Sequence, residues 1–151
     1  MGELLLALTP GIFVIPVLAF PAILFLGGKL PCRGASIGIV GMGICLAAST
    51  ALLVMALMQT LHLPYAWNFP WIRFGMFEVP MGVYVDGLSI VMLFVITLVS
   101  LLVQVYSLGY MHDEPRFTRY YAFLSLFTAS MLGLVIADNL LVIFACWELV
   151  G

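Results

Sequence analysis

Charge is scarce in this sequence. Five lysine or arginine residues and seven acidic residues make up 8% of the 151 positions, whereas charged residues form about 25% of an ordinary soluble domain. Hydrophobic residues make up 65%, more than a water-soluble fold can bury. The basic residues never form a run, which excludes a nucleic-acid-binding surface. We therefore expect an integral membrane protein.

Metal-binding side chains are scarce as well. The three cysteines, Cys32, Cys45 and Cys146, lie far apart and form no Cys-x-x-Cys pair, so neither a zinc site nor an iron–sulfur cluster is indicated. His62 and His112 fall in polar stretches rather than in the middle of an apolar run, which leaves no axial ligand for a membrane haem. We expect no cofactor or metal in this chain.

Long apolar runs dominate what is present. Four of them are long enough to cross a hydrocarbon core of about 30 Å at about 1.5 Å per residue. They cover about 4–26, 36–58, 86–106 and 117–136. A fifth run covers 140–151, and twelve residues reach only about 18 Å. We predict an all-α, polytopic transmembrane helix bundle of four full spans plus the start of a fifth.

Residues 1–151 are thus expected to form a single membrane domain. Because the fifth run is incomplete, we interpret the chain as an N-terminal fragment of a longer protein, or as a short subunit that a partner helix completes. Between the second and third runs, residues 60–85 are less hydrophobic and rich in proline, tryptophan and tyrosine. That composition predicts a long extramembrane loop at the level of the lipid headgroups.

Charged residues near the run ends have assignable roles. Asp86 opens the third run and is predicted to be its N-cap, where backbone N–H groups and the helix dipole favour an acid. Arg116 and Arg119 are three apart at the start of the fourth run and share a helix face. That face suits anionic lipid headgroups or an acidic partner subunit, and the sequence leaves both open.

The basic residues also predict orientation. Four of them follow the first and third runs, and one follows the second: Lys29, Arg33, Arg116, Arg119 and, alone, Arg73. Cytoplasmic loops carry the excess of Lys and Arg, so the N-terminus and the 60–85 loop are predicted to lie outside. A bacterial cytoplasmic membrane is the expected location, with a thylakoid or mitochondrial inner membrane as the alternative.

Five short segments go beyond generic membrane composition. They are 85–89 (VDGLS), 106–111 (YSLGYM), 119–123 (RYYAF), 137–141 (ADNLL) and 147–151 (WELVG). As a set, they resemble the N-terminal part of the antiporter-like chain 5, or L subunit, of proton-pumping NADH:quinone oxidoreductase (respiratory complex I). The WELVG ending is similar to the F subunit of the chloroplast and cyanobacterial version. The resemblance is strong over 84–151 and rests on pattern alone before that.

This resemblance implies a subunit of a proton-translocating enzyme that contains no redox site itself. Quinone, NADH, flavin and iron–sulfur clusters are then expected in other subunits, and the partners are other membrane-arm subunits and the lipid bilayer. Members of the family place a buried glutamate on their fifth helix, partnered by a lysine on a later helix. Glu148 falls at the position of that glutamate.

The expected depth of Glu148 in the membrane independently supports a functional role for this residue. Glu148 follows Asn139 by nine positions, which at about 1.5 Å each places it about 13 Å into a core about 30 Å thick. A charge near the middle of a membrane costs about 2.5–3.5 kcal/mol, so an unpaired glutamate there is expected to take up a proton. A nearby lysine favours the carboxylate instead. We therefore predict that Glu148 takes part in proton translocation.

Related functions remain open at this point. Similar chains occur in Mrp-type cation/proton antiporters, in membrane-bound hydrogenases and in inorganic-carbon uptake complexes. A non-transporting membrane scaffold subunit is a further alternative, which Glu148 opposes because a structural helix gains little from a carboxylate at membrane depth.

Overall fold

The computed structural model describes residues 9–29, 34–75, 77–111 and 114–151. In order along the chain, the elements of these residues are α2 (Thr9–Leu26), the 3-10 turn η1 (Gly27–Lys29), α3 (Ala35–Leu57), β1 (Tyr65–Phe74), β2 (Phe77–Val85), α4 (Gly87–Tyr110), α5 (Phe117–Ile136) and α6 (Leu140–Val150).

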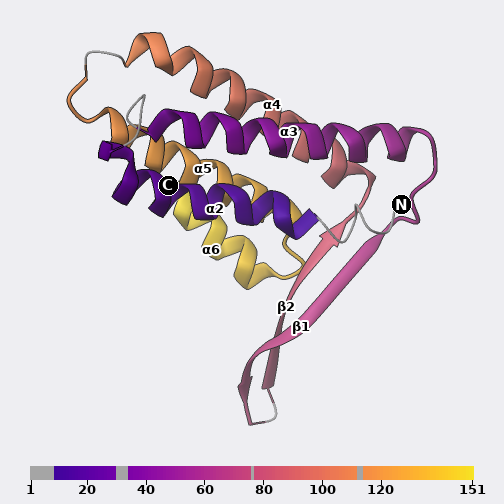
Figure 1. Cartoon of the computed structure of the whole chain (residues 1–151). Helices are drawn as coiled ribbons and strands as arrows, with labels where there is room; N and C mark the ends of the chain where they lie inside the picture. The colour runs from indigo at the N-terminus through magenta and orange to yellow at the C-terminus, as the bar shows by residue number, and fades with distance from the viewer. Residues whose placement is uncertain (1–8, 30–33, 76, 112–113) are drawn as a thin grey trace.

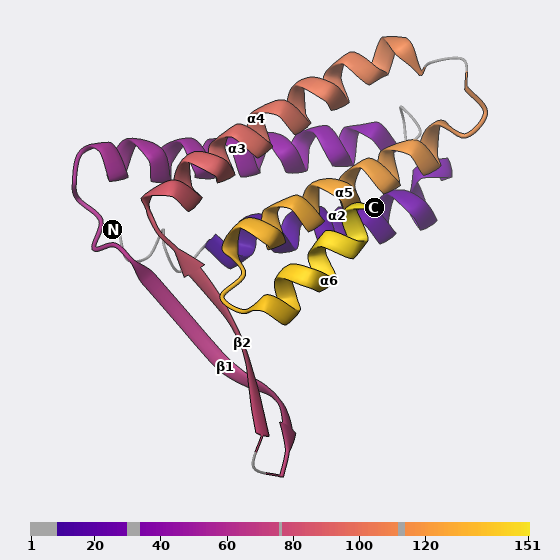
Figure 2. The same ribbon diagram turned by 180° about the vertical axis from the view of Figure 1, so that it is seen from behind.

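The helices run up and down in an antiparallel bundle (Figure 1). α3 and α4 lie side by side along one side, and α2, α5 and α6 form the other, as the reverse view also shows (Figure 2). The β1–β2 hairpin projects beyond the helices at one end, which we call the hairpin end. At the opposite end, which we call the arginine end, α2 finishes and α5 begins next to Arg116.

The predicted fold class is confirmed. α2, α3, α4 and α5 are each long and apolar enough to cross a membrane, and α6 is a shorter apolar helix. Most of their outward surfaces are large hydrophobic side chains, such as Leu18, Val40 and Leu102. Such surfaces suit a bilayer or the apolar faces of other membrane helices, because both surround the hydrophobic side chains with apolar groups.

Polar contacts join the helices inside the bundle. The Ser49 and Thr97 hydroxyls, on α3 and α4, are 2.8 Å apart, and Thr128 of α5 donates to Ser100 of α4 at 3.1 Å. All four side chains are buried or nearly so. Hydroxyl pairs of this kind hold membrane helices together, since lipid offers no alternative partner.

Residues 60–85 differ from the expectation of a loop. β1 and β2 form an antiparallel hairpin, closed at Gly75, which has a φ of +59°. The physical reason is a two-residue period: aromatic residues occupy alternate positions of β1, at 65, 67, 69 and 71, and aromatics favour strands. Pro70 and Pro80 are paired across the ribbon. Two-stranded ribbons accept proline because both strands are edge strands.

Candidate functional site

The helix that carries Glu148 begins at a capped turn. Asn139 is the N-cap of α6, and its side-chain oxygen accepts a hydrogen bond from the backbone N–H of Val142 at 2.9 Å. Its side-chain N–H donates to the backbone carbonyl of Pro80 in β2. One amide therefore starts α6 and attaches that start to the hairpin.

Asp138 provides a second attachment to the hairpin. Its carboxylate accepts from the backbone N–H of Gly82 at 3.1 Å and lies 3.5 Å from the side-chain nitrogen of Asn68. A Cβ atom at Gly82 would overlap this carboxylate and the Trp67 carbonyl, so the close approach requires glycine. Together with Asn139, Asp138 fixes the register of α6 relative to the hairpin.

The inner face of α6 packs on α5 at a glycine. Cys146 is the one buried residue of α6. A Cβ atom on Gly133 of α5 would lie 2.8 Å from the Cys146 sulfur and 2.8 Å from the Phe13 ring of α2. Three helices thus meet at Gly133, where only a residue without a side chain fits.

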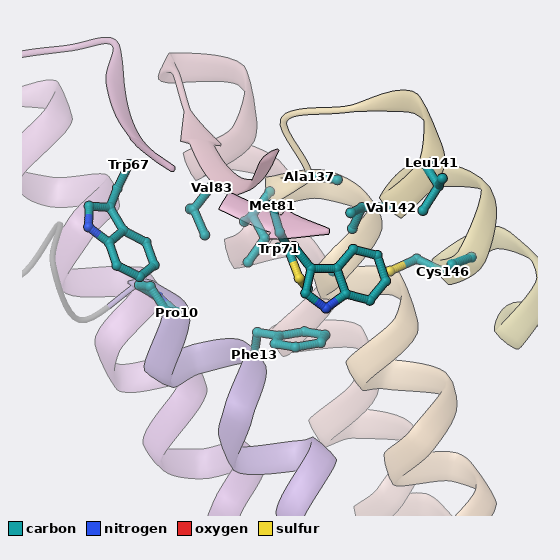
Figure 3. A pocket seen from close by; sticks show the side chains of 14 residues that line it. Pro10, Phe13, Trp67, Trp71, Met81, Val83, Ala137, Leu141, Val142 and Cys146 are labelled. Carbon is teal, nitrogen blue, oxygen red and sulfur yellow. The ribbon is translucent and has the colours of Figure 1, made fainter. Parts of the chain in front are cut away.

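An apolar cavity of about 260 Å³ lies between this junction and the hairpin. Figure 3 shows Trp71 reaching down from β1 above the Phe13 ring, with Cys146 beside it, while Trp67 lies over Pro10. The described residues that line the cavity include no Asp, Glu, Lys, Arg or His. Among its described lining residues, the Cys146 thiol is the one titratable group, so the cavity is overwhelmingly apolar.

Glu148 lies on the outer face of α6. Its side chain is exposed, as are those of Phe144 and Trp147. In the five described α-helices, Glu148 and Arg119 are the only residues of the Asp, Glu, Lys, Arg and His types, and Arg119 belongs to the first turn of α5. Glu148 is nine residues from its N-cap, about 13 Å along the helix. It is the charged residue set deepest in these apolar helices.

The other predicted site residues lie apart from Glu148. Asp86 caps α4 at the hairpin end, where its carboxylate accepts from the Ser89 backbone N–H at 2.7 Å and from the Ser89 hydroxyl at 2.8 Å. These two donors, the backbone N–H foremost, lower the pKa of Asp86 below its ordinary value. A carboxylate held in its charged form in this way acts as a helix cap.

Arg116 and Arg119 lie at the opposite, arginine end. Both side chains are exposed and both line one open hollow between the start of α5 and the end of α2. The structure thus brings the two arginines together, and places Asp86 and Glu148 on other elements.

Comparison with known proteins agrees with the sequence motifs. Residues 71–121 match the family model described as the N-terminus of chain 5 of NADH-ubiquinone oxidoreductase (complex I). In an alignment 149 positions long that covers 92% of this chain, the sequence is 40% identical to NAD(P)H-quinone oxidoreductase subunit 5 of Chlorokybus atmophyticus. The resemblance to complex I chain 5 is confirmed. Subunit 5 of Nephroselmis olivacea is 38% identical in an alignment of the same length that covers 93% of this chain.

A cyanobacterial relative is closer over a shorter stretch. Chain 5 of the Synechocystis NAD(P)H-quinone oxidoreductase is 49% identical over 90 residues, 60% of this chain. The chain spans 22% of the Chlorokybus protein, 23% of the Nephroselmis protein and 13% of the Synechocystis protein. These relatives are subunits of multi-subunit oxidoreductases by name, so their activity belongs to assemblies larger than this chain.

Sequence reasoning missed how α6 is held. Asn139 precedes an apolar run, and Asn is a usual N-cap, so that part of its role was detectable. Its contact with Pro80 and the contact of Asp138 with Gly82 have no sequence signal, because the composition of residues 60–85 predicts a loop and not a hairpin.

Proposed function

We propose that this chain is a proton-translocating membrane-arm subunit of an NAD(P)H:quinone oxidoreductase, with Glu148 as its proton-carrying residue. One observation carries the proposal: the deepest charged residue of its apolar helices is a glutamate, in a chain 40% identical to subunit 5 of such an enzyme. Ionisable groups inside membrane helices are functional by default, because each is costly to retain. Electron transfer, with its nucleotide, flavin, iron–sulfur and quinone cofactors, takes place in other subunits.

Glu148 acts by gaining and losing one proton. A cation close to the carboxylate favours its charged form, and withdrawal of that cation in a membrane favours the protonated form. A conformational change that moves the cation therefore makes Glu148 take up a proton, and the return movement releases it. The single lysine of this sequence, Lys29, belongs to η1 at the arginine end. The lysine that partners Glu148 is then expected outside residues 1–151.

The test is the Glu148→Gln variant in the intact complex. Glutamine keeps the shape and hydrogen bonding of the side chain but cannot titrate, so proton pumping per quinone reduced should fall while assembly stays normal. Pumping is measured by acridine dye quenching in inverted vesicles, beside quinone reduction and a native gel for assembly. Glu148→Asp, which still titrates, should retain more pumping than the glutamine variant.

Glu114→Gln is the matched control, since Glu114 lies outside the helices at the arginine end. It should leave pumping unchanged. A fully assembled Glu148→Gln complex that pumps at the normal stoichiometry would refute the role of Glu148 and favour a scaffold subunit.

We further propose that the hairpin end faces outside and the arginine end faces the cytoplasm, with the N-terminus outside. The excess of Lys and Arg at the arginine end supports this orientation. Single cysteines at Pro70 and Gly28, in a background without the three native cysteines, test it in intact cells. A membrane-impermeant maleimide should label position 70 and not position 28. Labelling of position 28 alone would reverse the orientation.

A further inference from the structure

The hollow at the arginine end joins two unlike surfaces. It has a volume of about 650 Å³ and is open to one side. The end of α2 and η1 contribute Leu24, Phe25 and Gly28, and the start of α5 contributes Arg116, Arg119 and their neighbours. A volume of this size lies within the range of about 300–1,000 Å³ that small-molecule sites occupy.

The α5 side of the hollow is positively charged. Neither Arg116 nor Arg119 forms an ion pair with a residue of the described ranges, and both side chains are exposed. The first turn of α5 contains no acidic residue, so the positive end of its dipole adds to the two charges. Glu114 is near in sequence but does not line the hollow. Two guanidinium groups at a helix start match the geometry of a phosphate.

The α2 side of the hollow is apolar and belongs to a membrane helix. Leu24 and Phe25 lie in the last turn of α2, and the Phe25 side chain is 77% exposed. The hollow therefore lies at the level where a membrane helix leaves the hydrocarbon core. A ligand that fits must be anionic at one end and apolar at the other.

We propose that this hollow binds an anionic phospholipid. Arg116 and Arg119 hold its phosphate, and the first part of an acyl chain lies against Leu24 and Phe25. A phospholipid reaches the hollow by diffusing in the membrane plane. A phospholipid carries a phosphate and an acyl chain in one molecule and so meets both surfaces, whereas an acidic loop of a protein meets the arginines alone. The combination of the two surfaces therefore favours lipid over an acidic loop.

The binding test uses the intact protein, purified in detergent with the subunits that accompany it. Phosphatidylglycerol, phosphatidylcholine with the same acyl chains, and inorganic phosphate are each titrated, and bound lipid is counted by native mass spectrometry. We expect saturable binding of phosphatidylglycerol that is tighter than binding of the other two. The Arg116→Gln/Arg119→Gln double variant should bind it about 30-fold more weakly, given the usual contribution of two basic residues near a membrane.

Three further variants separate charge, apolar contact and folding. Arg116→Lys/Arg119→Lys keeps both charges but not the guanidinium geometry, so its affinity should lie between those of the wild type and the glutamine variant. An unchanged unfolding temperature of the glutamine variant shows that its loss of binding is not a failure to fold. Phe25→Ala should weaken the binding of phosphatidylglycerol while leaving the arginines in place. Arg73→Gln removes one arginine from the hairpin, at the far end of the molecule, and should change nothing.

Four results would overturn the proposal. Equal affinity for the two phospholipids, or unchanged affinity in the glutamine variant, excludes recognition of the anionic headgroup at this site. Inorganic phosphate that binds as tightly as phosphatidylglycerol identifies a site for free anions. A glutamine variant that keeps its lipid but loses an accompanying subunit identifies an acidic protein partner.

Discussion

α5 and α6 are neighbours joined by a short turn, yet they are covered very differently. Ten residues of α5 are buried, including the hydroxyl groups of Ser125 and Thr128, whereas Cys146 is the one buried residue of α6. α5 packs against α2, α4 and α6, as both ribbon views show (Figures 1 and 2). α6 contacts the described residues along a single narrow stripe.

The difference places the candidate proton carrier on the less covered helix. Leu140, Phe144, Trp147 and Glu148 all face outward from α6. A glutamate that faced hydrocarbon at this depth would cost about 2.5–3.5 kcal/mol in its charged form. This cost falls when another protein helix covers the outer face of α6 and supplies a cationic or hydrogen-bonding partner for the carboxylate. The comparison therefore supports an assembly in which α5 belongs to the interior of this chain and α6 to an interface.

The largest effect is expected where α6 meets α5. Gly133→Val places a branched side chain where even a Cβ atom would lie 2.8 Å from both the Cys146 sulfur and the Phe13 ring. Overpacking of this kind costs about 1–3 kcal/mol, so thermal unfolding in detergent should occur at a lower temperature. Maleimide labelling of Cys146, now buried, should become faster as α6 separates from α5.

Gly43→Val is the matched control, because Gly43 is also inside a helix and a Cβ atom there has no described atom within 4 Å. This variant also replaces a helical glycine by valine, but without overlap between the new side chain and a neighbouring helix. Cys146→Ala should restore part of the stability of the Gly133 variant, since it removes one of the two atoms that clash. Equal destabilisation by both valines would mean that the contact at Gly133 does not hold α6.

A smaller effect is expected at the start of α6. Asn139→Ala removes the hydrogen bond to Val142 and the hydrogen bond to Pro80 together. Loss of an N-cap costs about 1 kcal/mol, which should appear as faster hydrogen exchange in the first turn of α6. Asn139→Asp keeps the cap but cannot donate to Pro80. If the aspartate variant exchanges as slowly as the wild type, the hairpin contact contributes nothing to the start of the helix.

Features that depend on neighbouring residues could be predicted from the sequence, whereas features that depend on contacts between distant residues could not. Spans follow from local composition, so the predicted runs coincide with α2, α3, α4 and α5, although α4 continues four residues beyond the predicted end, to Tyr110. The predicted start of the first run, at residue 4, lies outside the described residues. The cap position of Asp86 follows from its place before an apolar run. The hairpin was missed because prolines at 70 and 80 read as loop signals. Those prolines are tolerated only because the ribbon has two edge strands, a property of the folded sheet and not of the local sequence.

The candidate site residues likewise have some features that follow from the local sequence and some that do not. The depth of Glu148 follows from counting residues after Asn139, but which face of α6 packs on α5 depends on Gly133, in another helix. Likewise, the shared face of Arg116 and Arg119 follows from their spacing. The position of Phe25 across the hollow from these arginines could not be predicted, because α2 and α5 are distant in sequence.

The smallest expected effect compares the caps of α4 and α6 as the pH falls. Asp86 caps α4 with a carboxylate whose pKa is lowered by its hydrogen bonds from Ser89, whereas the Asn139 cap of α6 has no titrating group. A lowered folded-state pKa means that the contribution of Asp86 to stability is fully present above its unfolded pKa, about 3.9. It is lost as the pH falls through the lower folded value.

Hydrogen exchange, corrected for intrinsic rates, should therefore show less protection at the Ser89 amide at pH 3 than at pH 6, and unchanged protection at Val142. In Asp86→Asn, whose cap does not titrate, the Ser89 amide should lose this pH dependence. Equal acid sensitivity of both helix starts would show that acid loosens the bundle as a whole, and that the two caps do not distinguish α4 from α6.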